Sequence, residues 1–306
     1  MRVALFGGTG FVGSYIVDAL VERGHTPVLM VRPGSEDKLR HGDACETVEG
    51  EIEDERAVRR ALAGCDAAIY NIGILREEPG VSFVALQYEG AKRTMDAAME
   101  EGVYRFLLMS ANGVKANGTR YQETKYLAER YLAQTELAYT IFRPSVVFGD
   151  PRGRMEFCTQ LKEQMIAPPI PAPAFYEGLK PPQEYFRMAP VFVEDVAAAF
   201  AGSLENTDTH GRTLILCGPD EYQWPEIVRV IGRAIGKDKL VIPVPAALVM
   251  AAAAVLDRFS FFPITRDQLT MLLEGNTGGA AGVYEGLGIR PTPFNEEALG
   301  YLSAQG

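Results

Sequence analysis

Short apolar runs rich in β-branched and aromatic residues recur along the chain, and helical patterns separate most of them. The predicted strands cover residues 3–6, 28–31, 47–49, 67–71, 106–109, 139–142 and 213–216. The predicted helices cover residues 12–23, 55–62, 82–101, 121–134, 194–206, 224–235, 246–259, 266–274 and 295–303. Strands that alternate with helices form a parallel sheet covered on both faces. We therefore predict an α/β fold with a Rossmann-type, doubly wound parallel sheet.

The pattern changes after Gly149. Prolines cluster within residues 168–182, where they interrupt any helical or strand period, so we predict an irregular loop there. Residues 1–150 then form a nucleotide-binding domain, to which a segment near residues 190–217 returns. The rest of residues 151–306 forms a smaller, mainly helical C-terminal lobe for a substrate or partner.

The first predicted strand leads directly into a glycine-rich turn and then a helix. Gly7 permits a tight turn, Gly10 a close approach to a pyrophosphate, and Gly13 close packing of the helix. The start of that helix presents unpaired N–H groups and a positive dipole end to phosphates. The candidate cofactor residues here are Gly7, Thr9, Gly10, Phe11, Val12 and Gly13. The alternative is that the glycines serve packing alone.

Arg32 follows the second predicted strand, at the position that selects between nicotinamide cofactors. A carboxylate there binds the ribose hydroxyls of NAD, whereas a guanidinium pairs with the 2′-phosphate of NADP. The sequence therefore favours NADP(H) over NAD(H), with Ser35 and Lys38 as helpers. The alternative is a solvated surface arginine.

Tyr121 and Lys125 lie four residues apart on a predicted helix, so their side chains share one face. A nearby ammonium lowers the pKa of a phenol, which can then exchange a proton with a carbonyl or alcohol. A nicotinamide would exchange the hydride. The pair is the candidate catalytic machinery.

Further motifs occur in the order found in extended and atypical short-chain dehydrogenases/reductases, which the chain resembles. They lie at residues 7–13, 50–54, 88–93, 102–106, 121–125, 143–144 and 190–196. Later stretches, at residues 217–222, 242–245 and 265–276, look most like the atypical group that contains the 39-kilodalton accessory subunit of respiratory complex I and its bacterial relatives.

The resemblance implies a tightly held NADP(H) and an oxidoreductase or epimerase-like reaction at Tyr121 and Lys125. It also implies the alternative of a non-catalytic accessory or assembly protein of a membrane-associated redox complex. Ala111 stands where extended members place a catalytic serine or threonine, so that hydroxyl is missing. Ser110 is the candidate replacement, and Asn112 and Thr119 are others.

Residues near other strand ends are further cofactor candidates. They are Glu51, Ile52, Asn71, Ile72, Gly73 and Pro144. Glu51 and Ile52 would lie against the adenine. Asn71, Ile72 and Gly73 would lie alongside the ribose and pyrophosphate, and Pro144 would lie beside the nicotinamide. For the turn at residues 71–73, the alternative is an ordinary strand end.

Composition narrows the partners. With 47% hydrophobic and 23% charged residues the chain is typical of globular proteins, and its net charge of −10 argues against nucleic acid. Scattered cysteines and histidines predict neither a zinc site nor disulfides.

A strand that begins at Arg2 leaves no room for a signal peptide, so a cytoplasmic protein is expected. The apolar segment at residues 246–262 is a core helix or a contact with a membrane surface or partner protein. Nothing indicates the substrate or the oligomeric state.

Overall fold

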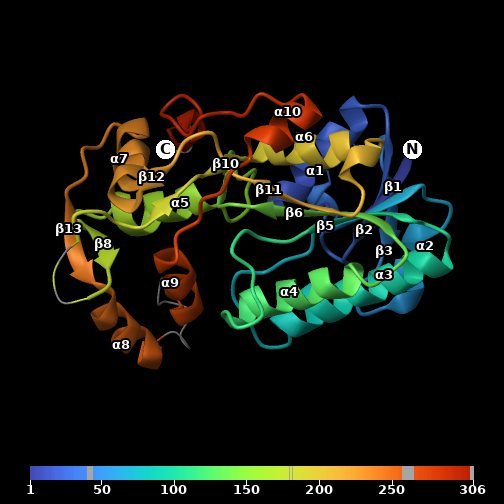
Figure 1. Ribbon diagram of the computed structural model, residues 1–306, viewed down its shortest axis with the longest axis horizontal. Coiled ribbons are helices and arrows are strands. Elements are labelled where there is room, and N and C mark those ends of the chain that lie inside the picture. Colours follow the sequence, from blue (N-terminus) through green and yellow to red (C-terminus); the bar gives the residue numbers. More distant parts are fainter. Residues whose placement is uncertain (40–43, 179, 181, 257–264, 304–306) are drawn as a thin grey trace. The chain divides into compact units, whose positions relative to one another are not determined.

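The computed structural model describes residues 1–39, 44–178, 180, 182–256 and 265–303 (Figure 1). The chain forms two compact units. Unit 1 comprises Met1–Pro144, Val193–Leu216 and Ala281–Arg290, and unit 2 comprises Ser145–Phe192, Cys217–Ala280 and Pro291–Gly306. Unit 1 thus includes residues 281–290, which the sequence pattern does not assign to the first domain.

Unit 1 is built on a parallel sheet of seven strands. They are β1 (Arg2–Phe6), β2 (Thr26–Val31), β3 (Glu46–Glu49), β4 (Ala67–Tyr70), β5 (Arg105–Met109), β6 (Ala138–Pro144) and β11 (Arg212–Leu216). Their order is β11-β6-β5-β4-β1-β2-β3, and every pairing is parallel. The strand order reverses between β1 and β4, and ligands of such sheets bind beyond the carboxyl ends of strands at that point. The predicted fold class is confirmed.

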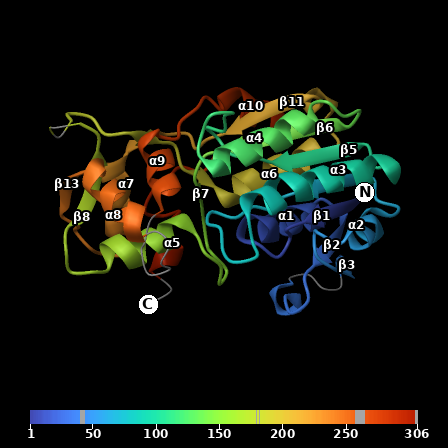
Figure 2. The ribbon, with the colours of Figure 1, turned by 90° about the horizontal axis from the view of Figure 1, so that it is seen from below.

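Helices cover both faces of this sheet because its central strands are buried and apolar. One face carries α1 (Phe11–Glu22), α6 (Val193–Ser203) and α10 (Ala281–Leu287) (Figure 1). The other carries α2 (Glu55–Leu62), α3 (Gly90–Glu100) and α4 (Arg120–Leu132), and Figure 2 shows the same layers from below. The long helix predicted at residues 82–101 begins with a π-helical segment, Val84–Glu89, before α3.

Unit 2 has its own hydrophobic core. Its helices are α5 (Phe157–Leu161), α7 (Trp224–Ala234), α8 (Ala246–Leu256) and α9 (Arg266–Leu273). Its strands form three pairs: β7 (Val147–Phe148) with β10 (Val191–Phe192), β9 (Arg187–Met188) with β12 (Tyr222–Gln223), and β8 (Ala172–Tyr176) with β13 (Val241–Pro245). Trp224 is 1% exposed and its indole N–H donates to Pro173 O at 2.9 Å, so this tryptophan packs the core.

Two local predictions were wrong, and one helix was missed. The predicted irregular loop contains strand β8, because a two-stranded pair has an outer edge where the missing N–H of Pro173 costs nothing. The predicted helix at residues 295–303 is only a 3₁₀ turn, Gly300–Leu302, after a turn that Asn295 caps. Helix α10 was missed because Gly282 and Gly286 lower its helical propensity. The end of the apolar segment, residues 257–262, lies outside the described residues.

Two glycines of the first turn are required by geometry. Gly7 has φ of +93°, and its carbonyl accepts from the Gly10 N–H at 3.2 Å. A Cβ on Gly13 would lie 2.0 Å from Gly7 O, so only glycine lets α1 approach the end of β1 this closely.

Gly13→Ala is therefore expected to lower the free energy of unfolding by about 3 kcal/mol or more, because backbone would have to move. Gly286→Ala is the matched control, since its Cβ would meet nothing within 4 Å on exposed helix α10. It should raise stability by up to about 1 kcal/mol. Chemical denaturation measures both; equal stability of the two variants would contradict the packing argument.

Candidate nucleotide site and its buried lysine

The N-terminus of α1 is open to an anion. Its N-cap, Gly10, has no side chain, and the first turn contains no acidic residue. A Cβ at Gly10 would meet only Gly7 O at 3.4 Å, so internal packing does not demand a glycine here. The bare backbone instead leaves room for a phosphate beside the first-turn N–H groups. The glycine turn therefore fits a dinucleotide pyrophosphate, and Thr9, Phe11 and Val12 are partly exposed on it.

The candidate residues after β2 and β3 differ in exposure. Arg32 is exposed immediately after β2, and Glu51 is exposed after β3. Ile52 is 4% exposed among core residues, and its carbonyl accepts from Arg93 at 3.0 Å. Both charged side chains therefore stand at the carboxyl edge of the sheet, while Ile52 lies beneath it.

The end of β4 is tied to the glycine turn. Asn71 N–H donates to Phe6 O at 2.9 Å, and Asn71 Nδ2 lies 3.4 Å from Gly7 O. A Cβ on Gly7 would also meet the Asn71 backbone at 3.0 Å. The turn and the end of β4 thus fit together closely.

Helix α4 carries Tyr121 and Lys125 to the same edge. Its N-terminus is fixed by a capping box in which Thr119 is the N-cap and Gln122 returns a bond to the Thr119 N–H. Lys125 is 4% exposed, and its Nζ donates to Met109 O at 2.8 Å and lies 3.5 Å from Ile72 O. The ammonium therefore sits beside the carboxyl ends of β4 and β5, under Gly73.

Burial sets the protonation of both side chains. It lowers the pKa of Lys125 to about 8, against the opposing effect of the Glu129 carboxylate. It raises the pKa of Tyr121 to about 12, and the Tyr121 ring packs edge-on against Phe83 at 5.8 Å. The pKa of the phenol is thus shifted upward, opposite to the expected lowering, because burial disfavours the charged phenolate. At neutral pH Tyr121 is a proton donor.

Ser110, Thr119 and Asn112, the candidates to replace the catalytic hydroxyl missing at Ala111, are bonded to other groups of the protein. Ser110 is 3% exposed and its Oγ donates to Glu129 Oε1. Thr119 Oγ1 caps α4, and Asn112 Oδ1 accepts from the Gly113 N–H at 3.1 Å. A catalytic contact by Ser110 stays a prediction, as do the other assigned contacts.

Glu129 and Arg143 were missed as interacting partners. The Arg143 Nε donates to Glu129 Oε1 at 2.9 Å, and its Nη2 pairs with Oε2. The available signal was the spacing of Tyr121, Lys125 and Glu129, which repeats every four residues along one helix face. Pro144 follows Arg143, is buried, and its carbonyl accepts from the Asn112 N–H at 2.8 Å.

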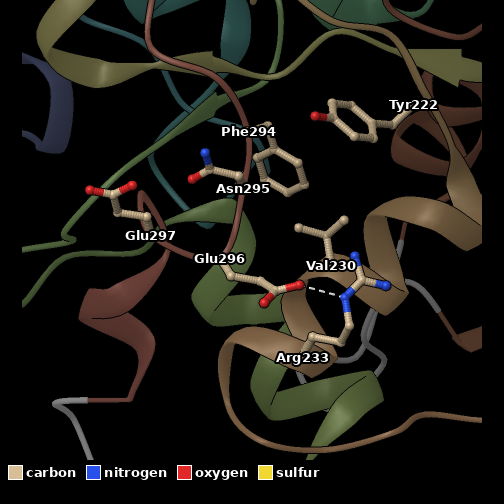
Figure 3. A pocket seen from close by; sticks show the side chains of 7 residues that line it. All are labelled: Tyr222, Val230, Arg233, Phe294, Asn295, Glu296 and Glu297. Carbon is tan, nitrogen blue, oxygen red and sulfur yellow. Dashed lines mark hydrogen bonds and ion pairs between the residues drawn. The ribbon is translucent and has the colours of Figure 1, made fainter.

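A pocket of about 360 Å³ lies within unit 2 (Figure 3). Tyr222, Phe294 and Val230 line it, and an exposed ion pair joins Arg233 Nε to Glu296 Oε1 at 2.5 Å. None of the predicted site residues lines it.

Within the described residues, no cluster of His, Cys, Asp and Glu is suited to a metal, and no helix is long and apolar enough to cross a bilayer.

Comparison with known proteins identifies what the chain is similar to. A family model described as NAD(P)H-binding matches residues 7–168. The mitochondrial NADH-ubiquinone oxidoreductase 40 kDa subunit of Neurospora crassa is 27% identical over 98% of this chain and 78% of its own length. The ceramide reductase of Caulobacter vibrioides is 25% identical over 84% of this chain and 78% of its own length.

Solved structures agree on the fold. The UDP-glucose 4-epimerase of Thermus thermophilus, in complex with NAD, superposes with a TM-score of 0.74 over 99% of this chain and 98% of that one. Its sequence identity is 19%, which supports the fold alone.

The buried charge of Lys125 has a measurable effect on stability. Because its pKa falls from 10.5 to about 8 on folding, the penalty is complete below pH 8 and is relieved as pH rises toward 10.5. Relative to Lys125→Met, the wild-type protein should gain about 2 kcal/mol of unfolding free energy between about pH 7 and about pH 9.5. Denaturation at each pH measures the gain.

The matched control is Lys180→Met, which removes an exposed lysine. Its stability should follow the wild-type pH dependence. A Lys125→Met curve that also runs parallel to wild type would show that the lysine is not buried as a charge.

Proposed function

Because the chain belongs to the NAD(P)H-binding family of short-chain dehydrogenase/reductase-like proteins, near the complex I 39-kilodalton subunit group, we propose that it is an NADP(H)-dependent oxidoreductase. The family assignment supports nicotinamide-nucleotide binding, and relatives that include reductases support the reaction class. The NADP preference and the catalytic roles are inferred from this chain's own residues.

The nucleotide would lie along the carboxyl edge of the sheet. The bare N-terminus of α1 would receive the pyrophosphate. The exposed guanidinium after β2, Arg32, would pair with the 2′-phosphate, which is why NADP(H) is favoured. Lys125, held at the ends of β4 and β5, would donate to a ribose hydroxyl.

A nicotinamide held there would supply the hydride that a substrate's carbonyl carbon accepts. Tyr121 O–H donates its proton to the carbonyl oxygen, so that the product is an alcohol and the phenolate is left to recover a proton from solvent. The Lys125 ammonium stabilises the phenolate that forms. Protonated Tyr121 suits this reductive direction, because its pKa is raised to about 12.

The observation that carries this proposal is the position of Lys125. A buried ammonium is costly, and a fold that only needed packing would place an apolar side chain there. Lys125 is instead held between two strand ends beside the nucleotide edge.

A second candidate function is a nucleotide-holding accessory protein that contacts a membrane or a protein complex. Ala111 lacks the catalytic hydroxyl, and the hydroxyls of Ser110 and Thr119 are already bonded to structural partners, which favours this accessory role. So do exposed apolar side chains in and around β13 and α8, at Leu240, Ile242 and Leu248.

Two measurements separate these functions. Mass spectrometry identifies any nucleotide released from the purified, denatured protein, and titration of the emptied protein compares NADPH with NADH. Exchangeable NADPH that is oxidised by a panel of aldehydes, ketones or quinones supports the oxidoreductase. NADP(H) that resists both exchange and oxidation supports the accessory role, and no binding of either nucleotide contradicts both.

Arg32→Glu is expected to weaken NADPH binding by about 1–3 kcal/mol, because it removes a charge-assisted contact and adds repulsion. NADH binding should change little. Isothermal titration of both nucleotides measures this, with Arg212→Glu as control, an exposed arginine at the opposite, amino end of β11. Unchanged NADPH affinity in Arg32→Glu would remove Arg32 from the site.

Tyr121→Phe is expected to lower NADPH oxidation with an active carbonyl substrate by about 100-fold or more, since the proton donor is lost. Affinity for NADPH should stay within about twofold of wild type. Single-turnover absorbance of bound NADPH reports the first quantity and titration the second. A variant that still turns over at the wild-type rate rules out the proposed role of Tyr121.

A further inference from the structure

Two side chains one turn apart on α4 hold two adjacent residues at the end of β5. Lys125 Nζ donates to Met109 O at 2.8 Å, and Glu129 accepts from Ser110 Oγ. Both α4 residues are nearly buried, Lys125 at 4% and Glu129 at 5% exposed. The register of α4 against β5 is therefore fixed at two successive points, and Tyr121 lies one turn further along the same face.

Glu129 also reaches the neighbouring strand. Arg143 Nε, near the end of β6, donates to Glu129 Oε1 at 2.9 Å, and Nη2 bonds to Oε2. Ser110 N–H in turn donates to Phe142 O at 2.8 Å. One carboxylate thus joins α4 to the ends of both strands.

Among the described residues, Glu129 is the carboxylate whose charge acts on Lys125. Arg143 on β6 pairs with Glu129, Tyr126 of α4 acts on Arg143, and Tyr121 lies one turn before Lys125 on α4. From β4 and β5, Lys125 meets carbonyl oxygens. Helix α3 places Asp96 and Lys92 against Tyr131, two turns beyond Lys125.

We infer that Glu129 is a positioning residue for the nucleotide site: its carboxylate fixes α4 on β5 and β6 and places a negative charge one turn from Lys125, where that lysine would meet the nucleotide and Tyr121. The link of Glu129 to nucleotide binding rests on the proposed function. The effect of Glu129 on α4 and Lys125 does not, because it can be measured in the nucleotide-free protein. Ser110 is then part of the support of Glu129, which gives its hydroxyl a role that needs no substrate.

The test is the pKa of Lys125, measured by NMR of carbon-13-labelled lysine side chains in the full chain without nucleotide. The Lys125 signal is assigned by its loss in Lys125→Met. In Glu129→Gln, which keeps the side-chain shape, we expect the pKa of Lys125 to fall by about one unit. In Arg143→Gln we expect it to rise, because a competing cation is removed from the carboxylate.

A further readout is nucleotide affinity. At neutral pH, Glu129→Gln should weaken NADPH binding several-fold more than Ser110→Ala, which removes a hydrogen bond without removing the charge. An unchanged Lys125 pKa in Glu129→Gln overturns the inference, and if that variant does not fold, an unchanged or lowered pKa in Arg143→Gln does so. If wild-type protein binds no nucleotide, the proposed function fails, while the pKa measurement still decides the role of Glu129.

Discussion

The ammonium of Lys125 is the constraint on which the arrangement of the site depends. A charge that is 4% exposed must be surrounded by hydrogen-bond acceptors and an opposite charge. Carbonyls at the ends of β4 and β5 supply the acceptors, and Glu129 supplies the charge. The same contacts bring α4 onto the carboxyl edge of the sheet, so the need to compensate one cation also determines where Tyr121 lies.

A second constraint acts at the other end of that edge, where backbone meets backbone. Gly13 brings α1 against the turn at Gly7, and Gly7 in turn leaves no room for a side chain beside Asn71. These contacts hold the start of α1, which has no side-chain cap, beside the carboxyl ends of β1 and β4. A helix start without a side-chain cap and a buried cation then occupy one edge of one sheet, an arrangement compatible with a dinucleotide's pyrophosphate and ribose.

Burial controls the protonation of the two candidate side chains. With a pKa of about 12, Tyr121 is protonated at neutral pH, and with a pKa of about 8, Lys125 is largely charged. Neither shift comes from the other member of the pair, since burial is the main cause of both. The hydroxyl next to Ala111 is bound to a carboxylate. Both candidate side chains therefore carry their protons at neutral pH, and the Ser110 hydroxyl is held within the protein.

The sequence alone determined the fold class and the family. Apolar periodicity located all seven strands of the main sheet, and the spacing of Gly7, Gly10 and Gly13 predicted the tight glycine turn between β1 and α1, because backbone geometry is dictated locally. Local pattern failed at β8 and at residues 295–303, where strand pairing and turn capping decide. Only the tertiary structure showed that Glu129 joins Ser110 to Arg143, and that burial raises the pKa of Tyr121. Those properties arise from residues far apart in the chain that exclude water together, so no local pattern could contain them.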